Sequence, residues 1–148
     1  MDTLVIGIGE EHRHDYALGL VAVRELRSPH TQGIEFMESD GEATTLVDAW
    51  ADVPLAIIVT AGDMGDAPGR IRRMGLHDAA LTSNDSPMGE AMALARSLDR
   101  MPHRLLVFRV QIHDGSPGDG LSSPASLAVG EVISEIADLL VTQRWARQ

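Results

Sequence analysis

The stretch LVIGIGEEHRHDYALG, residues 4–19, decides the fold of this chain. It begins with an apolar run rich in β-branched residues, which is typical of a strand buried on both faces of a parallel sheet. Gly7 and Gly9 end the run and allow close approach of a neighbouring backbone. Asp15 is a good helix N-cap, and apolar residues follow it at helical spacing. The stretch therefore predicts a strand, a loop at the strand end where α/β sheets bind ligands, and a crossover helix.

The rest of the chain continues this alternation. The apolar run at residues 55–59 predicts a central strand, because both of its faces must be covered. No repeat or linker interrupts the sequence, so we expect one α/β domain over residues 1–148. Further strands are predicted at residues 34–36, 76–81 and 105–110, and further helices at residues 46–50, at 88–98 and from Ser123 or Pro124 onward.

Composition excludes several classes of function. The net charge of −10 opposes binding to nucleic acid or anionic lipid. The chain has no cysteine, which excludes disulfides, thiolate metal sites and a cysteine nucleophile. It starts with acidic Asp2 and has neither a signal-like segment nor an apolar run long enough to span a membrane. The expected location is the cytoplasm.

Three segments of the chain match, in part and in order, three motifs of a known family. Residues 7–19 follow G-x-G-N-x-x-x-x-D-[ED]-[GA]-x-G, residues 60–69 follow D-A-x-x-x-G-x-x-P-G, and residues 82–84 stand at the position of S-S-H. A Gly/Ser/Pro-rich loop at residues 113–123 also resembles the pattern G-x-x-L-S-x-x-V. Together they resemble the nickel-iron hydrogenase maturation endopeptidases. The residues that carry the resemblance are Gly7, Gly9, Asp15, Ala17, Gly19, Ala61, Gly65, Pro68, Gly69 and Ser83.

The resemblance implies a fold and an activity. The fold is a single three-layer α/β/α domain, phosphorylase/hydrolase-like, with a mostly parallel five-stranded sheet. Its one short antiparallel strand has residues 76–81 as the candidate. The family removes a C-terminal extension from the hydrogenase large subunit once nickel is installed. The implied partner is therefore that subunit, and the implied metal is the nickel of the substrate, with no cofactor expected in the protein itself.

The chain departs from the family at the positions that matter for chemistry. Glu10 stands where the first motif has Asn. Tyr16, Thr60 and Asn84 stand where the family has two carboxylates and an imidazole as metal ligands. A phenol stays protonated near neutrality, a hydroxyl is a weak ligand and an amide oxygen carries no charge. We therefore expect a catalytically degenerate relative that holds no metal.

Alternatives remain open. One is an active endopeptidase with a relocated or substrate-supplied metal site, for which the rim offers candidate ligands. The candidates are His12, His14, Asp15, Asp63 and Asp85. The simpler interpretation makes Asp15 a helix cap, the two histidines a solvated loop pair and the other two aspartates turn formers. The second alternative is an unrelated nucleotide-binding α/β domain, which a missing third glycine and the lack of a Walker A lysine disfavour.

The position of the motifs gives a structural prediction. Parallel strands end at one edge of a sheet, and ligands gather there. The loops after Gly9, after Val59 and before Pro87 should therefore converge at one rim.

Overall fold

A computed structural model describes residues 2–27, 33–76 and 88–146. Within these ranges no helix is both long and apolar enough to cross a lipid bilayer. The elements in chain order are β1 (Thr3–Ile8), η1 (His14–Ala17), α1 (Leu18–Leu26), β2 (Ile34–Ser39), α2 (Ala43–Trp50), β3 (Leu55–Gly62), β4 (Ile71–Gly75), α4 (Gly89–Leu98), β5 (Arg104–Gln111) and α5 (Ser123–Ala146).

The five strands form one sheet in the order β2-β1-β3-β5-β4. Strands β2, β1, β3 and β5 run parallel, and β4 pairs antiparallel with β5. Every residue of β1 and β3 is buried, as the uninterrupted apolar runs predict for central strands. The predicted class, a mostly parallel five-stranded sheet with one antiparallel strand, is confirmed.

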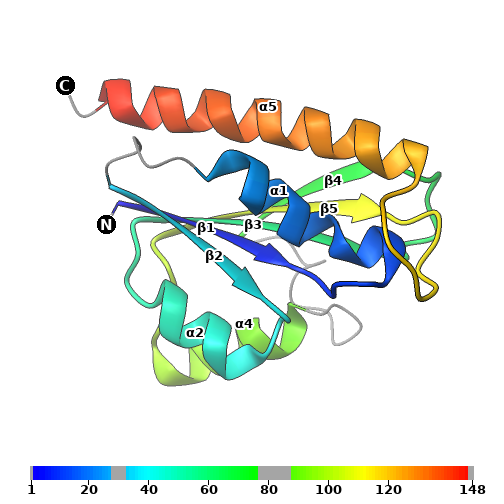
Figure 1. Cartoon of the computed structure of the whole chain (residues 1–148). Coiled ribbons are helices and arrows are strands. Elements are labelled where there is room, and N and C mark those ends of the chain that lie inside the picture. The colour runs from blue at the N-terminus through cyan, green and yellow to red at the C-terminus, as the bar shows by residue number, and fades with distance from the viewer. Residues whose placement is uncertain (1, 28–32, 77–87, 147–148) are drawn as a thin grey trace.

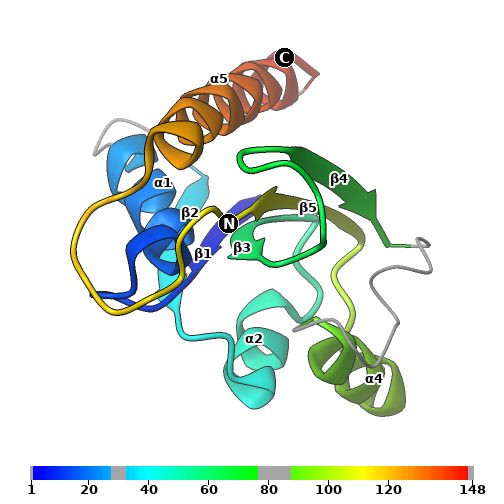
Figure 2. The same ribbon diagram turned by 90° about the vertical axis from the view of Figure 1, so that its right-hand side faces the viewer.

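Helices cover both faces of the sheet, which gives three layers (Figures 1 and 2). Helices α1 and α5 pack on one face, and α2 and α4 pack on the other. Each face has its own apolar core, and Trp50 and Phe108 are the largest wholly buried side chains of the two. The sheet is therefore a rigid base, and the loops at its edge carry the candidate site.

Two glycines set the distance between α1 and the sheet. A Cβ atom on Gly7 would lie 2.0 Å from the Gly19 carbonyl oxygen, and one on Gly19 would lie 2.2 Å from the Ile8 oxygen. No side chain fits at this backbone contact. The glycine spacing of the first motif is thus a requirement of helix packing.

The antiparallel strand is not where the sequence placed it. It is β4, Ile71–Gly75, whereas the prediction was residues 76–81. Leu76 forms a turn, and residues 77–81 lie outside the described ranges. The reason is that β4 is an edge strand with two exposed arginines, so it lacks the apolar pattern that marks a buried strand.

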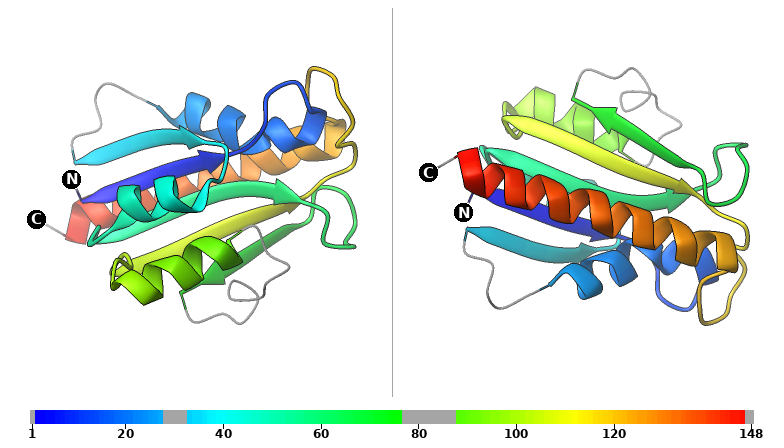
Figure 3. Two further views of the ribbon diagram at one scale, coloured as in Figure 1. Left: turned by 90° about the horizontal axis from the view of Figure 1, so that it is seen from below. Right: turned by 90° about the horizontal axis from the view of Figure 1, so that it is seen from above.

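The parallel strands end at a common rim, where the loops after β1, β3 and β5 lie close together (Figure 3). Residues 10–17 and 113–122 are joined by backbone hydrogen bonds, among them His14 N to Gly118 O and Asp15 N to Asp114 O, each 2.9 Å. The segment after Val59 reaches the same rim through the bonds from Ile112 N to Gly62 O, 3.1 Å, and from Gly69 N to Gln111 O, 2.9 Å. Two of the three predicted loops, those after Gly9 and Val59, therefore converge. The loop before Pro87 lies outside the described residues.

Candidate functional site at the carboxyl ends of the strands

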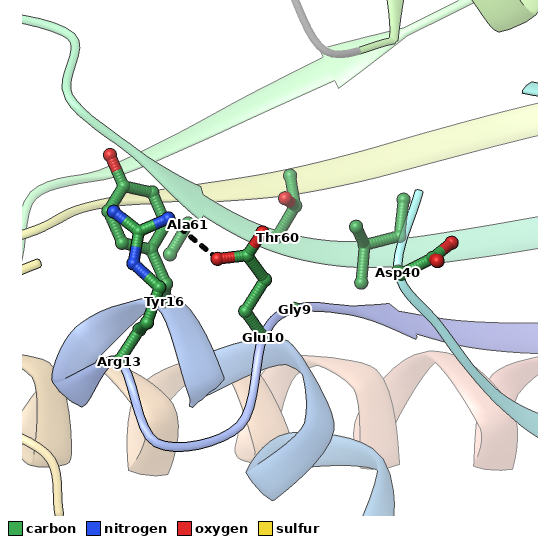
Figure 4. A pocket seen from close by; sticks show the side chains of 8 residues that line it. Gly9, Glu10, Arg13, Tyr16, Asp40, Thr60 and Ala61 are labelled. Carbon is green, nitrogen blue, oxygen red and sulfur yellow. Dashed lines mark hydrogen bonds and ion pairs between the residues drawn. The ribbon is translucent and has the colours of Figure 1, made fainter. Parts of the chain in front are cut away.

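A pocket of about 250 Å³ opens at this rim. It joins the end of β1, the loop into η1, the end of β2 and the last part of β3 (Figure 4). The residues that line it are Ile8, Gly9, Glu10, Arg13, Tyr16, Asp40, Thr60 and Ala61. Two of the three family ligand positions, Tyr16 and Thr60, thus share one pocket.

Tyr16 is held by its neighbours on both sides. The Arg13 guanidinium lies 4.6 Å from the centre of the Tyr16 ring, a cation-π contact. On another side the ring packs against Gly115, where an added Cβ would lie 2.4 Å from Tyr16 Cε2. Arg13 also donates a hydrogen bond of 2.6 Å to the Glu10 carboxylate (Figure 4). The first motif therefore supplies a phenol, a cation and an anion to the pocket wall.

Thr60 belongs to β3 and not to the loop in which the sequence placed it. The strand continues to Gly62, and Thr60 is only 4% exposed. Its position is therefore fixed by the pairing of β3 with β5, where Thr60 is the register partner of Arg109.

Asp15 is not a helix cap. The turn η1 has Arg13 at its N-cap and no side-chain cap hydrogen bond. The wholly buried Asp15 carboxylate instead accepts bonds of 2.8–3.0 Å from the backbone N–H of His113, Asp114 and Ser122 and from the Ser122 hydroxyl. Burial alone would raise the pKa of Asp15, but these hydrogen bonds hold it below its ordinary value. The sequence missed this role because the partners are about 100 residues away.

The two histidines of the first loop also bind the 113–122 loop. His12 is exposed, as predicted, and its Nδ1 lies 2.5 Å from the Asp119 carboxylate, which raises the pKa of His12. The His14 side chain is only 27% exposed, so it is less solvated than predicted. Its Nδ1 lies 3.0 Å from the Gly120 carbonyl oxygen. Both have positive φ, 63° and 44°, which is uncommon for residues with a Cβ and is concentrated at functional loops.

The turn within the second motif, residues 60–69, is held by hydrogen bonds with Gln111, a residue that the sequence analysis did not single out. Its buried side chain accepts bonds from the backbone N–H of Met64 and Asp66, and it donates a bond of 3.1 Å to the Asp63 carboxylate. Asp63 also accepts a bond from Gly65 N, so it is a turn former as predicted. The hydrogen bond from Gln111 lowers the pKa of Asp63.

The other motif residues divide between two places. Gly65 has a φ of +73°, which explains the glycine at that turn. Pro68 and Gly69 lie away from the pocket, against the first turn of α5 at Pro124. Ser83, Asn84 and Asp85 lie outside the described residues.

The side chains at the two family ligand positions in the pocket do not suit a resident divalent metal. Tyr16 and Thr60 supply a phenol and a hydroxyl, which are weak ligands when protonated. Across residues 2–27, 33–76 and 88–146, no three carboxylate or imidazole side chains are grouped to hold an ion. The relocated-site candidates His12, Asp15 and Asp63 are instead each committed to hydrogen bonds within the rim.

Two pocket residues were missed from the sequence. Arg13 lies in the first loop without a motif of its own, and Asp40 follows β2 at the same rim. The position of Asp40 just after a predicted parallel strand was the available signal, because such strands end at a common edge.

Comparison with known proteins supports the fold. Neither a scan of protein-family models nor a search of curated proteins finds a match. Among solved structures, the hydrogenase maturating endopeptidase HybD from E. coli is 20% identical, with a TM-score of 0.83 over 97% of this chain and 94% of that one. The [NiFe] hydrogenase maturation protease HybD from Thermococcus kodakarensis is 18% identical, with a TM-score of 0.73 over 95% and 99%. The hydrogenase 2 maturation peptidase from Thaumarchaeota archaeon SCGC_AB-539-E09 is 16% identical, with a TM-score of 0.72 over 95% and 98%. The resemblance seen in the motifs is confirmed as a resemblance of fold.

Proposed function

We propose that this chain, which has the fold of the hydrogenase maturation proteases, binds the carboxyl-terminal region of a nickel-iron hydrogenase large subunit without cutting it. The observation that carries the proposal is the pairing of Tyr16 and Thr60 in one pocket. The pocket stands where the motifs resemble those of the family, but its two described ligand positions hold neutral side chains. The binding surface is kept and the metal-binding groups are replaced.

The pocket wall suits recognition better than hydrolysis. Hydrolysis of a peptide bond needs an activated water or nucleophile and a group that stabilises the oxyanion. A phenol is a poor general base, and a threonine hydroxyl is a poor nucleophile unless a base takes its proton, whereas the carboxylate of Glu10 in the same pocket is paired with Arg13. Hydrogen-bond donors and acceptors around an open pocket are what a bound peptide needs.

The alternative is an active endopeptidase with a relocated or substrate-supplied metal. The pocket favours it through one feature, which is that the carboxylates of Glu10 and Asp40 both line the wall. Glu10 is paired with Arg13, and Asp40 accepts a bond from Glu42 N at 3.0 Å. A nickel ion carried by the substrate could be approached by either group only after these bonds are exchanged.

The test is incubation with a nickel-loaded large-subunit precursor, followed by intact-mass measurement and by a binding assay. We expect a complex and no loss of the C-terminal peptide. Arg13→Ala and Tyr16→Ala should each weaken the complex, whereas His103→Ala, an exposed position before β5 at the opposite end of the sheet, should not. Shortening of the precursor would establish the endopeptidase instead. Failure of the native chain to bind would refute the proposed function.

A gain of metal binding tests the ligand positions directly. We expect the triple variant Tyr16→Glu, Thr60→Asp and Asn84→His to bind nickel or zinc where the native chain does not, because the family resemblance implies that two carboxylates and an imidazole at these positions meet at one point. Close carboxylates repel, so the apo variant should melt at a lower temperature and recover with metal. Calorimetric titration and melting curves measure both effects.

The native chain is the control for this variant. If it already binds metal one to one, and His12→Ala or His14→Ala abolishes that binding, a relocated site exists. If the triple variant folds but gains no metal-dependent rise in Tm, then the loops do not hold the geometry of the family, and the degenerate-site interpretation is wrong.

A further inference from the structure

A row of three side chains crosses the sheet beside the pocket. In the pairing register, Arg109 on β5 lies opposite Thr60 on β3 and opposite Arg72 on β4. Register partners project from the same face of a sheet. Met74 and Val107, two positions away from Arg72 and Arg109, pack into the core under α2 and α4, which identifies that face. Thr60, Arg109 and Arg72 therefore lie side by side at the rim.

Arg109 is partly buried, and its guanidinium forms no ion pair with the residues that the structure describes. Its side chain runs over Gly62, where an added Cβ would lie 2.6 Å from Arg109 Nη2. Within the described part of the chain, Arg109 Nε is buried and has no hydrogen-bond partner. Burial, and after it the positive charge of Arg72, lower the pKa of Arg109 from its ordinary value. A buried donor without a partner is costly, so the arrangement lowers stability as it stands.

The nearby carboxylates are already engaged. Asp66 accepts a bond of 2.8 Å from Arg72 Nε. Asp63 accepts bonds from Gln111 and Gly65, and it acts on Arg109 only through its charge. Two like charges directly opposite on neighbouring strands are unfavourable unless an anion lies between or beside them. Neither Asp63 nor Asp66 is hydrogen-bonded to Arg109, so its guanidinium is available to an anionic ligand.

We propose that Arg109, with Arg72 beside it and the Thr60 hydroxyl as a further donor, binds the carboxylate of a ligand that enters at the rim pocket. The guanidinium is planar and presents parallel N–H groups, a geometry that matches both oxygens of a carboxylate. Because Gly62 has no side chain, the Arg109 guanidinium can lie against its backbone. The site needs no metal and does not depend on a hydrogenase partner, so it stands or fails apart from the proposed function.

The ligand carboxylate has two sources, a peptide and a small free acid. The test follows the Arg109 Nε–H signal by nuclear magnetic resonance while sodium acetate is added at constant ionic strength, with sodium chloride as the reference. A second titration uses a short acetylated peptide with a free carboxyl terminus, and a third uses the same peptide amidated. An ionic strength of about 0.15 M limits the repulsion that the net charge of −10 exerts on anions.

We expect a saturable shift of the Arg109 signal with acetate and none with chloride. Tighter binding of the acid peptide than of acetate identifies a peptide carboxylate as the ligand, whereas equal binding identifies a small acid. The amidated peptide should give no saturable shift. Arg109→Gln should weaken acetate binding about tenfold or more, because the charge-assisted bonds are lost. Since this variant lacks the Arg109 signal, acetate binding is followed in it and in the native chain by the backbone amide signals of Thr60 and Gly62. Arg104→Gln, at the other end of the same strand, should leave acetate binding unchanged.

Two results would overturn the proposal. One is a shift that chloride reproduces or that never saturates. The other is acetate binding of unchanged affinity in Arg109→Gln. If that variant does not fold, Arg72→Gln replaces it. It removes the second cation and frees Asp66, so acetate affinity must fall several-fold for the proposal to stand.

Discussion

Replacing Asp15 by alanine is expected to unfold the rim and to lower the free energy of unfolding by about 3 kcal/mol or more, since a buried charged acceptor is lost. The variant leaves three backbone N–H groups and the Ser122 hydroxyl without their acceptor. The size of the loss follows from the complete burial of the Asp15 side chain, which is the common acceptor of all four hydrogen bonds. Chemical denaturation of the native and variant chains measures it.

The matched control for this variant is Asp114→Ala. The Asp114 carboxylate is about half exposed, accepts hydrogen bonds from Ser116 in its own loop and lies 3.9 Å from His14 Nε2, so its loss should cost much less. Hydrogen exchange should show the amides of His113 and Ser122 unprotected in Asp15→Ala and protected in the control. Equal stability of the two variants would contradict the role given to Asp15.

The contribution of the Asp15 carboxylate to stability should depend on pH. Its pKa is lowered in the folded protein, so its stabilising contribution is present above the ordinary carboxyl pKa and is lost as the pH falls through the lowered value. The native chain should therefore have a higher free energy of unfolding than Asp15→Asn near neutral pH, and this difference should shrink as the pH falls below about 4. Denaturation curves at a series of acidic pH values measure the difference, and a difference that does not change with pH would rule this out.

Replacing Gly19 by alanine should have the second large effect. The new Cβ would lie 2.2 Å from the Ile8 oxygen and 2.5 Å from the Val59 oxygen, and both atoms belong to the backbone of buried strands. Since neither strand can move without breaking the sheet, α1 must shift, and we expect a loss of about 3 kcal/mol from overpacking. Thermal and chemical denaturation give the value.

Gly130→Ala is the control for the glycine. It lies in α5, is exposed, and has no atom within 4 Å of an added Cβ. Alanine there should stabilise the protein by up to about 1 kcal/mol through helix propensity. If both alanine variants were equally stable, the close contact between α1 and the sheet would not be a constraint.

The sequence was sufficient for elements with a strong pattern and insufficient where contacts are distant. The apolar runs predicted β1 and β3, and the helical spacing predicted α4 and α5. The edge strand β4 was missed because exposed arginines replace an apolar pattern. The roles of Asp15 and Gln111 were missed because a carboxylate or an amide gives no local signal of the loop it will bind. Pairing of Thr60 with Arg109 likewise depends on register, which the sequence alone does not set.

The hydrogen bonds of Asp15 also have a consequence for the order of events during synthesis. They connect residues that are 98 to 107 positions apart in the chain. A nascent chain that has emerged only as far as β4 can pair β1 with β2 and β3, but its first loop has nothing to bind. The first loop is held in place at the pocket only after β5 and the residues leading into α5 have left the ribosome. A partner that recognises this rim therefore meets it only after the residues up to Ser122 have left the ribosome.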